Sequence, residues 1–192
     1  MNDSTNDKAY RKKLWVQLRN SYGKLVYSYT THNKMCDMLI QKNKILKVSV
    51  IISSSVSSFG FLGTVINNTV WLNALSGIFS FITLALTIYS KEENITETVQ
   101  KHKETVDEMW LIREDYISLL TDFDKLSVLE IKEQRQELKN RLSLVYKKEP
   151  RTDSKAYNAA RKFIKDKEGQ YFKTEEKDQK LPDHLKEKHE KI

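Results

Sequence analysis

The amino-acid sequence predicts an all-α membrane protein: a two-transmembrane helical hairpin with long cytoplasmic antiparallel coiled-coil-like helices and C-terminal accessory helices. Three observations lead to this prediction. The 43 residues from 48 to 90 carry no charged side chain, although 31% of the 192 residues are charged. Apolar residues on both sides of this block recur at helical spacing. The chain contains only five glycines and two prolines, too little turn chemistry for a β-sandwich or barrel.

Composition excludes several other classes of protein. The single cysteine, Cys36, rules out an internal disulfide, and the glycines form no phosphate-binding motif. Residues 1–47 contain ten basic and three acidic residues, whereas residues 91–192 contain 23 of each. The net charge of +7 therefore lies entirely before the apolar block. Attraction to an anionic membrane leaflet explains this charge more simply than nucleic acid does, so no direct nucleic-acid binding is expected.

The uncharged block divides into two membrane spans. Asn67, Asn68 and Thr69 favour a turn, so we expect transmembrane helices over 48–66 and 70–90 and an external loop over 67–69. Each helix would span roughly 30 Å, the thickness of a bilayer core. The alternative is a buried hairpin in a soluble helical bundle, but buried core helices seldom run without charge for this length.

Charge also predicts the orientation of the hairpin. Lys42, Lys44 and Lys47 precede the first span, Lys91 follows the second, and the loop between the spans has no charge. We place the protein in the cell inner membrane. By the positive-inside rule, both of its termini then face the cytoplasm.

Each span carries a row of small or polar residues. In the first span the candidate helix-packing residues are Ser49, Ser53, Ser57, Gly60 and Thr64. In the second span the candidate pore-facing residues are Asn73, Ser76, Ser80, Thr83 and Thr87. Rows of this kind favour close helix packing in any membrane bundle, and they also suit a water-filled pore in an oligomer. The two interpretations are compatible, because a pore needs packing faces as well.

The cytoplasmic segments are expected to pair as two antiparallel helices. Residues 1–8 are expected to be disordered, with helices over 9–47 and 91–125. After the spans a heptad seam contains two polar residues, His102 and Arg113, which would set the register. If residue 47 faces residue 90, Arg19 lies within about one turn of Asp115 and Asp122. We therefore hypothesise an ion pair between Arg19 and one of these two carboxylates.

The remaining segments are expected to be accessory. Ser127 and Glu130 form a capping box at the start of a helix over 127–148, and a short helix should follow over 153–168. Residues 173–192 read as a charged, flexible tail. His184 and His189 within it are poorly spaced for a metal site. We expect no catalytic residues, no cofactor and no metal, and therefore no enzyme.

The segments LWVQLRNSYGKLVYSYTTHNK and KHKETVDEMWLIREDYISLLTDF, which flank the two spans, resemble the SLATT family. These are the SMODS and SLOG-associating two-transmembrane effectors of prokaryotic conflict and anti-phage systems, and the resemblance covers roughly residues 8–168. The framework residues are Trp15, Arg19, Tyr22, His32, Asp115 and Tyr116. The resemblance implies an oligomeric effector that forms a pore or disrupts the membrane and so causes abortive infection. It also implies a separately encoded sensor: a nucleotidyltransferase, a nucleotide sensor or a reverse transcriptase.

Two alternatives to this function stay open at the level of the sequence. The chain could be a passive membrane adaptor whose coiled coil recruits a partner. It could also be a small transporter subunit, but the absence of charged residues within the spans argues against coupling to protons or ions.

Overall fold

The computed structural model describes residues 2–67 and 70–165, except for the side chains of residues 2–6, 64 and 67. These residues form five α helices and no β strand. The helices are α1 (Asn2–Asn67), α2 (Val70–Glu93), α3 (Ile95–Thr121), α4 (Val128–Lys148) and α5 (Ser154–Lys165). The predicted all-α hairpin is confirmed. The expected tail at 173–192, with His184 and His189, lies outside the described residues, as do Asn68 and Thr69.

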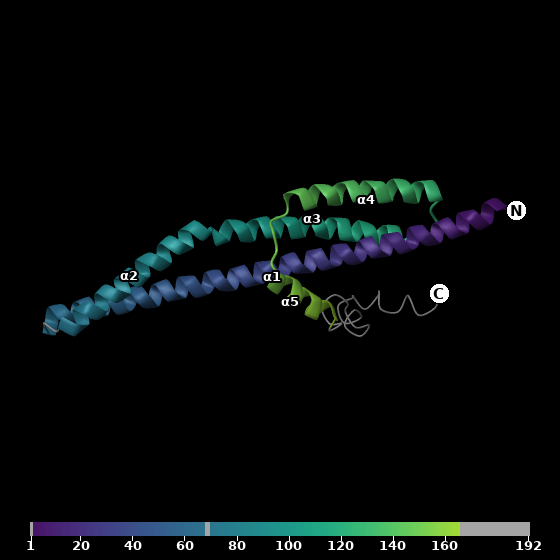
Figure 1. The fold of residues 1–192 in the computed structure, drawn as a ribbon. Helices are drawn as coiled ribbons and strands as arrows, with labels where there is room; N and C mark the ends of the chain where they lie inside the picture. The colour runs from purple at the N-terminus through teal and green to yellow at the C-terminus, as the bar shows by residue number, and fades with distance from the viewer. Residues whose placement is uncertain (1, 68–69, 166–192) are drawn as a thin grey trace, which may run out of the picture.

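The long helix α1 runs the whole length of the molecule (Figure 1). From the tip of the hairpin, α2 and then α3 return along it. Helix α4 lies beside α3, and α5 packs against α1 on the other side of the molecule (Figure 1). The hairpin tip and the four-helix end are therefore distinct regions that share one continuous helix.

Three boundaries differ from the sequence prediction. Helix α1 begins at Asn2, not after residue 8, because no proline or glycine interrupts the chain before Gly23. The returning arm is broken at Asn94, whose φ of 38° ends α2 and starts α3. Asparagine tolerates this left-handed conformation better than most residues. Helix α3 ends at Thr121 instead of residue 125, where the Asp122 N–H bonds to the Ser118 carbonyl.

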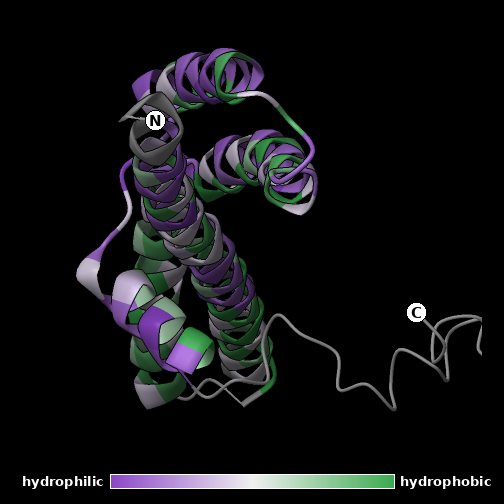
Figure 2. Ribbon diagram, turned by 90° about the vertical axis from the view of Figure 1, so that its right-hand side faces the viewer, coloured by the Kyte–Doolittle hydropathy of each residue, from purple (hydrophilic) through white to green (hydrophobic). Residues whose placement is uncertain are grey.

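A hydrophobic core fills the end of the molecule away from the hairpin tip. It joins α1, α3 and α4 through Leu14, Leu18, Leu25, Met109, Ile112, Tyr116, Leu119, Ile131, Leu138, Leu142 and Val145. The Trp15 ring meets the Phe123 ring edge-on at 5.0 Å. Hydrophilic residues cover most of α4 and the N-terminal part of α1 (Figure 2), as expected for a surface in water.

The turn between α3 and α4 is held by two devices. The Arg11 guanidinium donates to the carbonyls of Phe123 and Leu126, at 2.7 and 2.8 Å. The predicted capping box is confirmed: Ser127 accepts from the Glu130 N–H, and the Glu130 carboxylate accepts from the Ser127 N–H. These contacts fix α4 against the start of α1.

Candidate functional site

The two arms at the hairpin tip expose many large apolar side chains. One stretch in α1 and one beginning with α2 each contain an 18-residue window of mean hydropathy 1.7, of which only 11% and 6% lie buried. Large apolar side chains such as Ile66 and Val70 are 78% and 82% exposed. A soluble bundle would bury these residues, so this surface has the character of a lipid-facing one.

The two arms meet through small residues. Ser76 Oγ donates to the Ser57 carbonyl at 2.6 Å, and Ser57 Oγ donates to the Ser76 carbonyl at 3.2 Å. Ser57 Oγ also lies 2.5 Å from Ser80 Oγ. A Cβ atom on Gly60 would lie 3.1 Å from Ser76 Cβ and 3.2 Å from the Leu72 carbonyl. The absence of a side chain at Gly60 therefore permits the close approach of the helices.

The candidate helix-packing residues occupy different environments. Ser53 and Gly60 are buried, Ser57 is half-buried in the contact with α2, and Ser49 is partly exposed. The side chain of Thr64 lies outside the description. Ser53, Ser57 and Gly60 thus form a face of α1 that is turned inward within a single chain.

The candidate pore-facing residues differ in their exposure. The sequence interpretation placed Ser76 on an open, pore-facing side of the helix. The structure corrects this placement: Ser76 is only 6% exposed and bonds to Ser57. The reason is that its small side chain allows α1 to approach. Asn73, Ser80 and Thr87 are exposed and lie seven residues apart, on one line of α2. Thr83 is half-buried, and its hydroxyl donates to the Phe79 carbonyl at 2.8 Å.

An ion pair marks the junction between the apolar arms and the polar part of the molecule. Lys42 Nζ lies 2.7 Å from Glu93 Oε2 and 5.2 Å from the centre of the Tyr89 ring. Glu93 is the last residue of α2, directly before the break at Asn94. The junction therefore joins α1 to the point at which the returning arm changes direction.

A buried histidine pair is the most unusual polar feature of the bundle. His32 of α1 and His102 of α3 are 2% and 0% exposed, and their Nδ1 atoms lie 2.8 Å apart. His32 Nε2 lies 3.2 Å from Oε2 of Glu149, which caps the C-terminus of α4. These contacts connect α1, α3 and the end of α4 through one chain of hydrogen bonds.

The proton positions in this histidine cluster (His32, His102 and Glu149) follow from Glu149. An ionised carboxylate can only accept, so His32 Nε2 carries a proton and His32 Nδ1 accepts from the Nδ1–H of His102. His102 Nε2 then has no proton, and it has no hydrogen-bond partner within the described part of the chain. Burial, followed by the charge of His102, lowers the pKa of His32 to about 4. Burial also lowers the pKa of His102 and raises that of Glu149.

The cluster does not amount to a metal centre. No group of three or more His, Cys, Asp or Glu side chains could hold a metal ion in the described ranges. Cys36, one turn from His32, points its thiol at the Val99 carbonyl at 3.8 Å. What the cluster can do is fix the rotation of α1 against α3.

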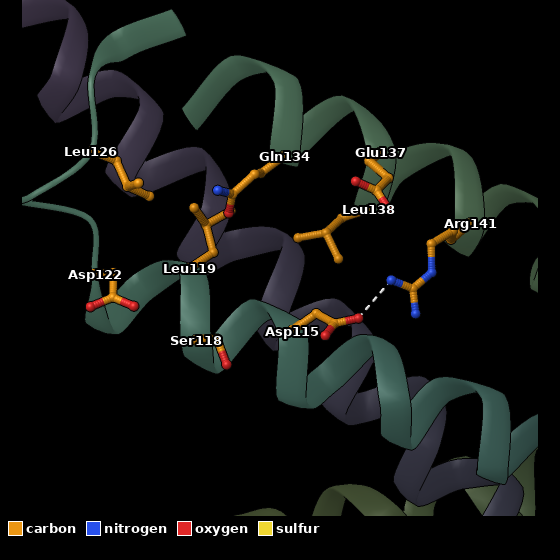
Figure 3. Close-up of a pocket in the computed structure, with 9 residues that line it drawn as sticks. All are labelled: Asp115, Ser118, Leu119, Asp122, Leu126, Gln134, Glu137, Leu138 and Arg141. Atoms are coloured by element: carbon orange, nitrogen blue, oxygen red, sulfur yellow. Dashed lines mark hydrogen bonds and ion pairs between the residues drawn. The ribbon is translucent and has the colours of Figure 1, made fainter. Parts of the chain in front are cut away.

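The hypothesised ion pair of Arg19 is wrong. Arg19 is exposed, and Asp115 instead accepts from Arg141 of α4 at 2.6 Å (Figure 3). Asp122 lies 3.5 Å from Lys125, three residues later. Pairing residue 47 with residue 90 put Asp115 within about one turn of Arg19, but this pairing could not anticipate that α4 would lie beside α3.

The remaining framework residues lie in or against the core, or in the histidine cluster. Trp15 and Tyr22 pack against it, Tyr116 is buried within it, and His32 belongs to the histidine cluster. Glu149 was missed: it continues the spacing of Leu142 and Val145 on the apolar face of the predicted helix, but it directly precedes Pro150, where the sequence indicated only the end of that helix. The pairing of His32 with His102 could have been found: a hairpin that pairs residue 47 with residue 90 brings them within about one turn.

Comparison with known proteins gives one match. The model of the family described as "SMODS and SLOG-associating 2TM effector domain family 4" matches residues 14–176. No curated protein and no solved structure matches the chain. The family match spans α1 from residue 14 onward, both apolar arms, and helices α3 to α5.

Proposed function

Because this chain belongs to SMODS and SLOG-associating 2TM effector domain family 4, we propose that it permeabilises the inner membrane of an infected bacterial cell. Family membership and the two apolar arms make the chain an integral membrane protein and an effector domain of conflict and defence systems. The proposal adds that several copies assemble into a pore, and that the resulting leak kills or arrests the cell.

The proposed membrane position follows from charge. Residues 48–66 and 70–90 would cross the bilayer, with the Lys42–Glu93 pair at the cytoplasmic headgroup level. Lysines near both ends of the charge-free block favour a hairpin with both termini in the cytoplasm. The histidine cluster and the polar bundle would then lie inside the cell.

The observation that carries the pore proposal is the line of Asn73, Ser80 and Thr87 along α2. These three polar residues are exposed among apolar neighbours, although the Ser80 hydroxyl also contacts Ser57 and the Thr87 hydroxyl donates to the Thr83 carbonyl. A polar side chain that faces lipid is unfavourable, so such a line favours contact with water or with another copy. The seven-residue spacing keeps the three side chains on one face of a helix.

The proposed partner is a separately encoded sensor. The family name links the domain to SMODS and SLOG systems, which supports a sensor outside this chain. Its signal would change the packing of the cytoplasmic helices and so rotate the spans. Such a change biases two states of one assembly, as in other switching proteins.

The test is a leak across the inner membrane. Expression of the full chain with its neighbouring genes, under activating conditions, should depolarise cells and admit a dye that intact membranes exclude. Changing Asn73→Leu and Thr87→Leu together should abolish both signals, because the proposed water-facing line would lose two of its three polar side chains. Thr87 bonds within α2, to the Thr83 carbonyl, so its replacement removes no described contact with α1. The matched control is Phe81→Leu, an exposed apolar position of the same helix, which should leak normally.

A passive adaptor would behave differently. It would insert into the membrane and leave the membrane potential unchanged in every variant. Normal leakage in the Asn73→Leu/Thr87→Leu variant would remove this line of residues from the pore.

A further inference from the structure

We infer that the polar bundle packs against a second copy of itself, with an outer face of α1 in one copy entering the groove between α3 and α4 of the next. This inference rests on the proposed function, which requires an oligomer, and it identifies the two surfaces that meet. Both surfaces lie outside the apolar arms, so the contact is independent of how the spans pack.

The first surface is a basic ridge on α1. It consists of Lys12, Lys13, Val16, Asn20 and Lys24, all exposed. These residues lie on the opposite side of α1 from the core residues Leu14 and Leu18. Residues 8–36 contain seven lysines and arginines and no acidic residue. At the centre of the ridge, Val16 is 49% exposed, so the ridge combines an apolar contact point with surrounding positive charge.

The ridge is the uncovered continuation of a face that α5 covers nearer the membrane arms. There the Tyr157 ring lies 6.4 Å from the ring of Tyr27, and the Phe163 ring lies 4.3 Å from Lys34 Nζ. From Tyr27 toward the N-terminus, Asn20 and Lys24 still line a hollow with Tyr146 of α4 and Tyr157 of α5, whereas Lys12, Lys13 and Val16 lie exposed beyond it. The same side of α1 thus has one half packed by its own chain and one half available to another.

The second surface is the acidic groove between α3 and α4 (Figure 3). It has a volume of about 260 Å³, and Leu119, Leu126 and Leu138 are among its lining residues. Its carboxylates come from Asp115, Asp122 and Glu137, and Arg141 is the lining residue of opposite charge.

The acidic character continues along α3. The line of α3 that enters the groove consists of Glu104, Glu108, Leu111, Asp115, Ser118 and Asp122, at alternating spacings of four and three. None of these positions is basic, and Leu111 is exposed. The groove therefore offers apolar contact within an acidic rim, the complement of the ridge.

Ridge and groove lie at the same distance from the membrane arms. Arg135 of α4 donates to Gln17 of α1 at 2.8 Å, and the Trp15 ring meets Phe123 beside the groove. Copies inserted in one membrane share one orientation, so surfaces at equal height can meet. Because no residue belongs to both surfaces, one copy can use its ridge and its groove at once, and such a head-to-tail contact forms a ring when the rotation between copies closes.

The test is a disulfide between two differently tagged full-length chains in a Cys36→Ser background. One chain carries Val16→Cys and the other carries Gln134→Cys, a groove-lining position. In membranes treated with a mild oxidant, we expect a cross-linked product that bears both tags. The control replaces Gln134→Cys with Leu129→Cys, an exposed position of α4 outside the groove, and should give little product.

Charge reversal provides the second arm of the test. Lys12→Glu with Lys24→Glu, or Asp122→Lys with Glu137→Lys, should each lower the cross-linked fraction about tenfold, since attractions become repulsions. The two reversals together should restore it. Circular dichroism checks that each variant is folded.

Equal cross-linking in the Leu129→Cys control, or a yield that no reversal changes, would overturn the inference. Membrane potential is recorded in the same cells. Depolarisation without the Val16–Gln134 product overturns this interface and leaves the pore proposal standing. The product without depolarisation supports the interface and contradicts the proposed function. Loss of both refutes both.

Discussion

Two histidines separated by 70 positions in the chain share one hydrogen bond in the interior of this protein. Each ring is buried, and only one of the two facing Nδ1 atoms can act as the acceptor. The pair therefore tolerates one additional proton but not two, because two cationic rings would direct N–H groups at each other. This arrangement makes the contact between α1 and α3 sensitive to acid.

The pH dependence of stability follows from the lowered pKa values. The folded state favours neutral His32, whose pKa is about 4, whereas an ordinary histidine side chain has a pKa of 6.5. Its contribution to the free energy of unfolding is complete above pH 6.5 and is lost as the pH falls to about 4. The loss is on the order of 3 kcal/mol. The pKa of Glu149 is raised, so its protonation at low pH favours the folded state and offsets part of this loss of stability.

We therefore expect the thermal unfolding midpoint in detergent to fall between pH 6.5 and pH 4, and the fall to be smaller in His32→Gln. The measurement is the circular dichroism signal of the helices across this range. Lys101→Gln, an exposed neighbour of His102 that pairs with Glu97, is the control and should keep the full fall. An identical pH dependence in His32→Gln and the parent would contradict this account.

The contact between helices α1 and α2 depends on small residues instead of apolar bulk. In lipid, apolar side chains gain little from leaving their surroundings, so close approach and interhelical hydrogen bonds must hold the arms together. Gly60 and the serines that surround it provide both. Asn94 has a different role, since its left-handed conformation lets the returning arm bend while α1 continues.

Two glycines of the hairpin should respond oppositely to a methyl group. Gly60→Ala should destabilise the hairpin by about 1–3 kcal/mol, because the new Cβ would press on Ser76 and on the backbone of α2. Gly77→Ala should be neutral or stabilise by about 0.5–1 kcal/mol, since its Cβ would meet no described atom within 4 Å. Thermal unfolding in detergent measures both. Equal effects at the two positions would show that the observed packing of α1 on α2 is wrong.

The complete molecule joins an apolar hairpin to a polar bundle through one continuous helix. A rotation of α1 within the bundle would therefore be carried directly into its membrane arm, whereas the break at Asn94 partly uncouples α2 from α3. The two regions have different stabilising forces: burial of apolar surface in the bundle and small-residue packing in the hairpin.

The proposed topology predicts which cysteines a membrane-impermeant maleimide can reach. In a Cys36→Ser background, Val70→Cys at the hairpin tip should be labelled on intact spheroplasts. Tyr10→Cys, near the N-terminus, should be labelled only after the membrane is disrupted. Mass spectrometry measures the labelled fraction of each variant before and after the membrane is disrupted. Labelling of Tyr10→Cys in intact spheroplasts would contradict a cytoplasmic N-terminus.

Periodicity and charge in the sequence predicted the all-α hairpin and the capping box at Ser127. These features depend on local spacing along the chain, and local spacing decides which face of a helix a residue occupies. The sequence did not reveal which of several possible partners each face would meet. Arg19 was the partner expected for Asp115, and the position of α4 beside α3 selects Arg141 instead.

The sequence by itself determined that this chain is helical, that its middle is too apolar for water, and that its positive charge precedes that block. Only the tertiary structure decided that His32, His102 and Glu149 form one hydrogen-bonded chain, that Ser76 faces α1, and that a basic ridge and an acidic groove stand at equal height. The reason is that side-chain partners are set by the distances between helices, and residues far apart in the chain acquire those distances only when the helices pack.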